Sequence, residues 1–316
     1  MKKISIILCT YNGEAYLGEQ LDSLLRQTYP FYELIVQDDG STDRTVELIN
    51  EYRQQFPGRN IHLYINSERL GYNRNFLTAA CRATGEYIAC CDQDDVWMGH
   101  KLETLMQTIG NSPLIFHDSI PTCDGKTNGR LHQRPLPSVF PPLSAVLYPR
   151  SYGHQILFRR DVQERIKPFT GYDVSYDYLI FTLAASIGPV RYLHTPLVYW
   201  RRHTDAVTYR AQAVKTGKWQ GYADALRALN SKENRQRTRQ YFGMLRQVAF
   251  CQPRVARAVR YLSRGSLCGI LGASLLCLFH NREAVPEAKG LTRLLRAFFL
   301  PAFFVRDHGR YIVRLP

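Results

Sequence analysis

The chain has 316 residues, enough for one large α/β domain or for a domain of about 200 residues with an appendage. Residues 206–316 hold 20 Lys and Arg against 5 Asp and Glu, so nearly all of the net charge of +14 lies there. The eight cysteines have neither metal-ligand spacing nor the density of a disulfide-stapled scaffold, which excludes both classes. We expect reduced thiols, with Cys9, Cys90 and Cys91 in the core.

The first ninety residues alternate between strand and helix patterns. Short apolar runs are separated by segments with apolar residues at helical spacing, a pattern typical of a mostly parallel sheet covered on both faces. We predict strands at 4–9, 34–36, 61–65 and 87–91, and helices at 17–25, 46–52 and 72–83.

The later patterns are less regular. Residues 118–150 are rich in Pro, Gly and Ser, which predicts a long irregular loop of the kind that often serves as a lid. Residues 179–187 have helical character, and 190–193 and 197–200 predict a final pair of strands. The apolar run 267–279 has 13 residues, whereas a spanning helix needs about 20. The apolar run within residues 1–10 is too short for the apolar region of a signal peptide, so we expect a cytoplasmic protein.

Three polar loops follow the predicted strands. In parallel sheets ligands lie outside the carboxyl ends of the strands, where residues 10–14, 38–41 and 92–95 would converge. Asp92 and Asp94, one residue apart, predict a hard oxygen site for Mg²⁺ or Mn²⁺ on a pyrophosphate, although such a pair also occurs in solvated turns. No glycine-rich dinucleotide or P-loop motif is present, so metal and side chains must hold the phosphates.

Two further carboxylates have alternative interpretations. Asp39 can accept the N3–H of uracil or thymine, or it can belong with Asp38 to a turn that caps the next helix, and the two roles are compatible. Asp177 precedes an apolar helical run, which on local pattern alone favours a helix N-cap.

Several ordered motifs resemble the glycosyltransferase family 2 pattern. They are Thr10-Tyr11-Asn12-Gly13-Glu14, Gln27-Thr28-Tyr29-Pro30 and Asp38-Asp39-Gly40-Ser41-Thr42-Asp43, and the stretch 83–103 is similar to the bacterial rhamnosyltransferase-like branch. The resemblance covers 1–205 and implies a GT-A catalytic domain, with a nucleotide-binding half at 1–117 and an acceptor half at 118–205. Residues 206–316 would form a basic helical extension.

The resemblance also implies site residues. Asp177 matches the catalytic base, although Tyr176 stands where the branch usually has His. His203 matches a histidine that helps to hold the metal or diphosphate, although Trp200-Arg201-Arg202-His203 replaces Tyr-Arg-Gln-His, and a structural role is the alternative. The implied metal ligands are Asp92, Asp94 and His203, with Asp94 the direct one. The implied nucleotide-sugar contacts are Thr10, Tyr11, Asn12, Glu14, Asp39, Arg74, Asn75, Asp92 and Gln93.

The expected reaction is an inverting single displacement, assisted by Mn²⁺ or Mg²⁺. The resemblance implies a dTDP-rhamnose or UDP-hexose donor and a saccharide acceptor carried on a polyprenyl diphosphate, in O-antigen or capsule synthesis. One alternative is a sugar-1-phosphate nucleotidylyltransferase. Such an enzyme needs a glycine-rich basic loop after the first strand, whereas residues 10–14 contain one Gly and no Lys or Arg. The other is a nucleic-acid-binding module built on the basic tail, where aromatic residues are sparse.

The basic tail predicts contact with an anionic membrane surface. Residues 267–279 and 297–305 supply apolar surface, and arginines such as Arg264, Arg282 and Arg293 flank them, which is typical of peripheral binding to the inner leaflet. The alternative is a helical subdomain that packs on the catalytic core or on a second subunit, so a homo-oligomer stays open.

Overall fold

The computed structural model describes residues 1–123, 126–127, 129–132, 136–203, 218–309 and 312–313. The chain divides into two compact units. The first comprises 1–138, 151–171 and 191–209, and the second comprises 139–150, 172–190 and 210–316. The predicted division into 1–205 and 206–316 stays a prediction.

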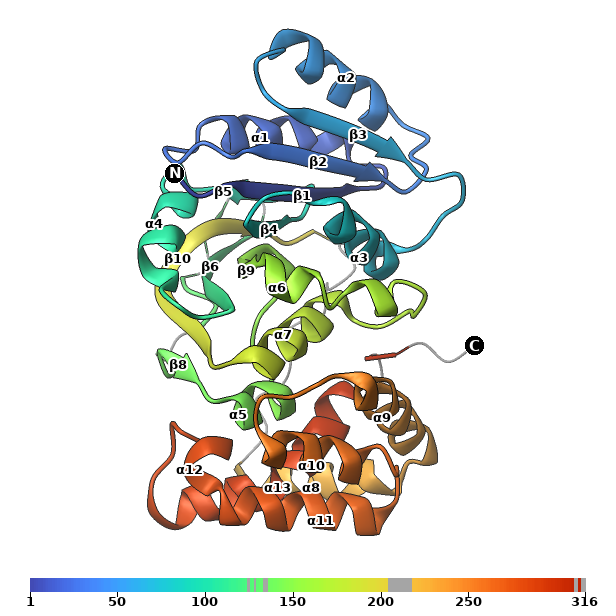
Figure 1. Cartoon of the computed structure of the whole chain (residues 1–316), viewed down its shortest axis with the longest axis vertical. Coiled ribbons are helices and arrows are strands. Elements are labelled where there is room, and N and C mark those ends of the chain that lie inside the picture. Colours follow the sequence, from blue (N-terminus) through green and yellow to red (C-terminus); the bar gives the residue numbers. More distant parts are fainter. Residues whose placement is uncertain (124–125, 128, 133–135, 204–217, 310–311, 314–316) are drawn as a thin grey trace. The chain divides into compact units, whose positions relative to one another are not determined.

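A mixed sheet forms the centre of the first unit (Figure 1). Its strand order is β3-β2-β1-β4-β9-β6-β10-β5, and β7 pairs antiparallel with the end of β6. β3, β2, β1 and β4 are parallel, β6 and β10 are parallel, and β9 is antiparallel to both β4 and β6. The strands are β1 (Ile4–Thr10), β2 (Glu33–Asp38), β3 (Ile61–Ile65), β4 (Tyr87–Cys91), β5 (Val96–Trp97), β6 (Leu114–Cys123), β7 (Lys126–Thr127), β9 (Ile156–Arg159) and β10 (Val190–Arg201).

Helices cover both faces of this sheet. Ile4, Ile6 and Leu8 alternate along β1 and share one buried cluster with residues of α1 (Glu14–Leu25), α2 (Thr45–Gln55) and α4 (Lys101–Ile109). α3 (Tyr72–Arg82) packs against β1 and β2 and contributes no residue to that cluster. The short helices α6 (Arg160–Gln163), η1 (Gly153–Gln155) and η2 (Lys167–Phe169) complete the unit. The predicted α/β alternation is confirmed, as is the burial of Cys9, Cys90 and Cys91.

The predicted irregular loop at 118–150 is wrong in part. β6 continues to Cys123, and the polar residues His117, Asp118 and Ser119 lie on it fully buried. The second unit also has a strand and a helix in this stretch, β8 (Val139–Phe140) and α5 (Pro142–Leu147). α5 starts at a proline, which suits the first turn of a helix because its missing N–H has no intrahelical partner there. Proline content therefore misled the prediction.

The predicted final pair of strands is a single strand. β10 runs from Val190 to Arg201, and its register with β6 shifts between Leu193 and Pro196 and again between Pro196 and Tyr199. Proline has no N–H to donate to a ladder, which explains why the sequence pattern breaks there while the strand continues.

The second unit is mainly helical. It contains α7 (Tyr176–Ile187), which confirms the helix predicted at 179–187, together with α8 (Lys218–Asn230), α9 (Lys232–Met244), η3 (Leu245–Gln247), α10 (Pro253–Leu262), α11 (Leu267–Phe279), α12 (Asn281–Ala284) and α13 (Gly290–His308). α11 packs against α10 and α13, and α13 packs against α8. Within the described ranges, no helix combines the length and apolar character needed to cross a membrane.

Candidate active site

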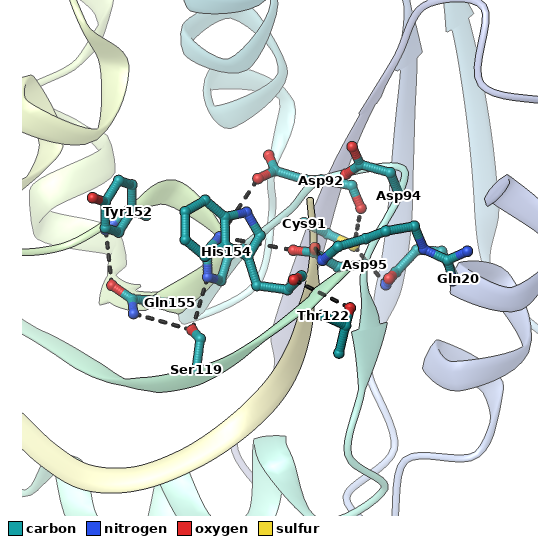
Figure 2. A network of polar contacts seen from close by, with 12 residues as sticks. Gln20, Cys91, Asp92, Asp94, Asp95, Ser119, Thr122, Tyr152, His154 and Gln155 are labelled. Atoms are coloured by element: carbon teal, nitrogen blue, oxygen red, sulfur yellow. Dashed lines mark hydrogen bonds and ion pairs between the residues drawn. The ribbon is translucent and has the colours of Figure 1, made fainter. Parts of the chain in front are cut away.

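An acidic loop lies at the carboxyl end of β4. Figure 2 shows Asp92, Asp94 and Asp95 on this loop. The side chains of Asp92 and Asp94 are 31% and 20% exposed, whereas Asp95 is fully buried. β4 is interior to the sheet, so its end opens onto the rim where ligands of α/β sheets bind. The loop therefore presents two accessible carboxylates above a buried one.

His203 faces this loop from beyond the end of β10. Its Nε2 lies 2.9 Å from Asp94 Oδ2, and its ring lies 5.0 Å from that of Tyr16. Burial and the neighbouring Asp92 raise the pKa of Asp94, while His203 opposes the rise. The structure thus brings together two of the three predicted metal ligands.

His154 approaches the same loop from the other side and had no predicted role. Its Nδ1 lies 3.7 Å from Asp92 Oδ2 and 3.7 Å from Asp95 Oδ2. Atoms of these three side chains all lie within 4.8 Å of one another, close enough to hold a metal ion. His154 stands two residues before Ile156, where β9 begins, but β9 itself was not predicted.

Buried polar contacts hold His154 in place. Ser119 Oγ lies 2.8 Å from His154 Nε2, and Gln155 Nε2 donates to the same hydroxyl at 3.1 Å (Figure 2). Lys101, at the start of α4, donates from Nζ to the carbonyl oxygen of His154 at 2.7 Å. Its ammonium also lies 3.3 Å from the centre of the Trp97 ring, and burial lowers its pKa to about 7.

The residues of this cluster fit a divalent cation. Asp95 Oδ1 accepts the backbone N–H of Arg201 at 3.1 Å, but its buried Oδ2 accepts no hydrogen bond. Burial raises the pKa of Asp95 well above its usual range, and Asp94 and Asp92 add to the rise. Closely spaced carboxylates with imidazole nitrogens beside them form the oxygen-rich donor set that Mg²⁺ and Mn²⁺ accept.

The loop after β1 is hydrogen-bonded to the acidic loop. Tyr11 N–H donates to Gln93 Oε1 at 2.8 Å, and Gln93 Nε2 donates to the carbonyl oxygen of Tyr11 at 3.1 Å. A Cβ on Gly13 would lie 2.4 Å from Gln93 Oε1, so any other residue at this position would displace the Gln93 amide. Thr10 is buried and donates from Oγ1 to Asp38 Oδ2 at 2.8 Å.

Asn12 and Glu14 join the loop after β1 to the loop after β2. Asn12 Oδ1 accepts the backbone N–H of Thr42 at 2.9 Å, and Glu14 Oε2 accepts that of Arg44 at 2.7 Å. The predicted nucleotide-binding residues Thr10, Tyr11, Asn12, Glu14 and Gln93 therefore meet at one rim, where Asn12 and Glu14 also have structural roles.

Asp39 is buried and shapes a third loop. Its Oδ1 accepts the N–H of Leu70 at 2.7 Å, and its Oδ2 accepts that of Gly71 at 2.8 Å. Asn66 also donates to Asp39 Oδ1, at 2.9 Å. The N-cap of α2 is Arg44 and has no side-chain cap, so the alternative that Asp38 or Asp39 caps the next helix is wrong. The turn itself is present, because Asp38 Oδ1 accepts the N–H groups of Gly40 and Ser41. Arg69, on the third loop, stacks 3.8 Å from the centre of the Tyr11 ring.

Arg74 and Asn75 lie on the first turn of α3. Asn75 is buried; its Nδ2 donates to the carbonyl oxygen of Gln37 at 2.9 Å and its Oδ1 accepts from Asn66 at 2.8 Å. Arg74 has a buried Nε without a hydrogen-bond partner. Of the two, Arg74 has the greater capacity to meet an anionic ligand.

Asp177 lies in the second unit, on the first turn of α7. Ser175 occupies the N-cap position, so the interpretation of Asp177 as the N-cap is wrong. Ser175 Oγ donates to Asp177 Oδ1 at 2.5 Å, and the N–H of Tyr178 donates to the same oxygen at 2.8 Å.

Comparison with known proteins points to one family. The family model described as glycosyl transferase family 2 matches residues 5–178. An uncharacterized glycosyltransferase of Nostoc sp. is 29% identical over 221 residues, which cover 64% of this chain and 65% of that protein. The poly(ribitol-phosphate) β-N-acetylglucosaminyltransferase TarS of Staphylococcus aureus is 39% identical over 97 residues, which cover 30% of this chain and 17% of TarS. The chain thus spans less than two thirds of each.

Solved structures show the same fold over nearly the whole chain. Residues 1–349 of TarS in complex with UDP-GlcNAc match with a TM-score of 0.58 and 17% identity, covering 98% of this chain and 91% of that one. The mannosyltransferase PcManGT of Pyrobaculum calidifontis in complex with GDP-Man and Mn²⁺ matches with a TM-score of 0.51 and 19% identity, covering 97% and 87%.

Proposed function

Because the chain belongs to glycosyl transferase family 2, with the predicted GT-A fold, we propose that it is a metal-dependent, inverting glycosyltransferase. The observation that carries the proposal is the pairing of Asp94 with His203 beside Asp92, at the rim of the sheet. These family matches favour a transferase over the nucleotidylyltransferase and nucleic-acid-binding alternatives. Membership of the rhamnosyltransferase-like branch stays a prediction.

Asp92, Asp94 and His203 would hold the cation. His154 lies 3.7 Å from both Asp92 and Asp95, so His154 and the buried Asp95 carboxylate would provide further ligand atoms or orient Asp92. The buried oxygen of Asp95 without a hydrogen bond supports this assignment. A bound Mn²⁺ or Mg²⁺ neutralises charge that grows on a diphosphate leaving group. PcManGT, solved with Mn²⁺, is a precedent on the same fold.

Asp177 would act as the base. The acceptor hydroxyl gives its proton to the Asp177 carboxylate, and its oxygen bonds to the anomeric carbon as the bond from that carbon to the diphosphate oxygen breaks. The nucleoside diphosphate leaves with the electron pair. One displacement at one carbon inverts its configuration, so no covalent nucleophile is needed.

The donor would be a UDP- or dTDP-linked sugar. Asp39 lies at the carboxyl end of β2, where it would accept the N3–H of uracil or thymine, and Arg69 stacked on Tyr11 borders the same rim. TarS, solved with UDP-GlcNAc, makes UDP-N-acetylhexosamines the first sugars to test, beside dTDP-rhamnose. The acceptor would be a saccharide on a polyprenyl diphosphate, in the synthesis of a cell-surface polysaccharide such as O-antigen or capsule.

A lipid-linked acceptor would require the protein to lie at the inner face of the membrane. α11 exposes four apolar side chains, Leu267, Leu271, Leu275 and Phe279. They are spaced four residues apart and therefore lie on one face of the helix. Exposed apolar side chains beside a strongly basic surface are typical of peripheral membrane binding.

A donor screen tests the proposal. The chain is mixed with Mn²⁺ and one of UDP-GlcNAc, UDP-glucose, dTDP-rhamnose or GDP-mannose, and the thermal unfolding midpoint is measured. A bound donor stabilises the folded state by mass action, so we expect a UDP- or dTDP-sugar to raise the midpoint and to be hydrolysed slowly. Stabilisation by GDP-mannose alone would refute the assigned base specificity, and no response to any donor would refute the proposed activity.

A further inference from the structure

Four arginines of the second unit line one pocket. Arg239 of α9, Arg246 of η3, and Arg260 and Arg264 at the end of α10 surround a hollow of about 370 Å³, together with Ser263. All four side chains are exposed, so the pocket opens to solvent. α9 and α10 are neighbours in the helical unit (Figure 1). η3 begins at Leu245, directly after the last residue of α9.

No described carboxylate neutralises this cluster. Residues 206–316 include only five acidic residues, and each of them forms an ion pair with an arginine that does not line the pocket. The pairs are Asp224 with Arg227, Glu233 with Arg237, Glu283 with Arg254, Glu287 with Arg150 and Arg296, and Asp307 with Arg306. Four like charges converge without a counter-ion, which costs free energy unless an anion joins them.

The backbone holds the arginines close together. Gly265 follows α10 with a φ of +66°, and a Cβ built on it would lie 2.7 Å from Arg239 Cβ. The turn after α10 and the helix α9 therefore meet at van der Waals distance at this point. Tyr241 and Phe242 of α9, Leu245 of η3 and Leu262 of α10 are buried, so the elements that carry the arginines are anchored by core residues.

The chemistry of the lining selects a phosphate group. Guanidinium groups match phosphate oxygens with paired hydrogen bonds, and four of them line this pocket. The Ser263 hydroxyl donates to the carbonyl oxygen of Arg260 at 3.0 Å, so the arginines are the available donors. The volume lies at the small end of the range for ligand pockets, which suits a phosphate or diphosphate group. α11 begins at Leu267, directly after this pocket, and the positive end of its dipole adds to the potential there.

We propose that Arg239, Arg246, Arg260 and Arg264 form a phosphate-binding site in the helical unit, separate from the acidic loop. The ligand is a phosphate or diphosphate ester, borne either by a lipid or by a soluble molecule. This inference concerns binding and holds whether or not the proposed transferase activity is correct.

Binding of inorganic pyrophosphate in EDTA tests the site, because removal of divalent cations leaves the acidic loop unable to bind pyrophosphate. The test variant is the pair Arg239→Gln and Arg260→Gln. The control is the pair Arg257→Gln and Arg282→Gln, which also removes two exposed arginines but none from the pocket. We expect the test pair to weaken binding at least tenfold and the control pair to change it less than twofold. A second test pair, Arg246→Gln with Arg264→Gln, should behave like the first.

Equal losses in test and control pairs would overturn the proposal, because they would show a diffuse charge effect. Absence of pyrophosphate binding by the unaltered chain would overturn it as well. Vesicles of phosphatidylcholine with and without phosphatidylglycerol identify the source of the phosphate. Phosphatidylglycerol-dependent binding that the test pair abolishes and pyrophosphate inhibits supports a lipid ligand. Pyrophosphate binding lost in the test pair while vesicle binding is unchanged supports a soluble one.

Discussion

His203 Nε2 lies 2.9 Å from Asp94 Oδ2, although the two residues are 109 positions apart in the chain. One follows β10 and the other follows β4, so the contact exists only because the sheet brings the ends of these strands to one rim. Each residue was proposed as a metal ligand on separate motif evidence. Their pairing adds to the group of Asp92, Asp95 and His154, whose ligand atoms all lie within 4.8 Å of one another, and together these contacts support a cation site.

Replacing Asp177 with Asn should abolish transfer while donor binding changes little. The substitution removes the proton acceptor but keeps the size of the side chain, and the base acts on the acceptor sugar rather than on the nucleotide. Turnover and donor affinity are measured on the same preparation. A collapse of donor affinity would instead place Asp177 in the donor pocket or in the fold.

Replacing Gly13 with Ala should weaken UDP or dTDP binding about tenfold, or 1.4 kcal/mol. The added Cβ would lie 2.4 Å from Gln93 Oε1 and would push that amide away from the backbone of Tyr11. Gly18→Ala is the matched control, because a Cβ there meets only the Tyr52 hydroxyl, at 3.8 Å. Equal affinities for all three proteins would show that the Tyr11 and Gln93 contact does not shape the pocket.

Asp39→Asn should reduce the preference for UDP over CDP. If Asp39 accepts the N3–H of uracil, an amide in its place can donate to the N3 of cytosine instead. The same carboxylate holds the N–H groups of Leu70 and Gly71, so the variant should also be less stable, by about 1–3 kcal/mol. The ratio of the two affinities is therefore the readout. An unchanged ratio would leave Asp39 with the structural role alone.

His308 should make the protein less stable in mild acid. Burial lowers its pKa from 6.5 to about 4, so the folded state keeps the ring neutral while the unfolded chain takes up a proton. The contribution of His308 to the free energy of unfolding is therefore fully present above pH 6.5. It is lost as pH falls toward 4, by about 3 kcal/mol in total. His308→Phe keeps an aromatic ring against Tyr178 and Phe304 and should flatten this dependence in denaturant titrations. His100→Gln, at an exposed position, should not; equal slopes for all three proteins would contradict the account.

The sequence predicted the rim of the site better than its interior. Thr10, Tyr11, Asp39 and Asp94 follow strands with strong apolar patterns, so their convergence could be read from the alternation of strands and helices. His154 could not be found in this way, because β9 has only four residues and enters the sheet antiparallel, between β4 and β6.

Buried polar residues show another limit of the prediction. Asp118 and Ser119 fall in the stretch predicted as a loop from its Pro, Gly and Ser content, yet they lie inside β6 and contact residues further along the chain, His132 for Asp118 and His154 for Ser119. Local patterns carry no information about such partners. The same limit applies to Lys101, which is buried and reaches the carbonyl oxygen of His154 from the start of α4.

The most direct test of the account measures sugar transfer from the preferred UDP- or dTDP-sugar with Mn²⁺, with EDTA, and with Asp94→Ala in excess Mn²⁺. We expect full activity in the first case and none in the other two. His203→Ala should need roughly ten to a hundred times more Mn²⁺ for half-maximal rate, since it removes one ligand and leaves the carboxylates. Full activity in EDTA, or in Asp94→Ala, would contradict the central claim that a cation at this rim assists the transfer.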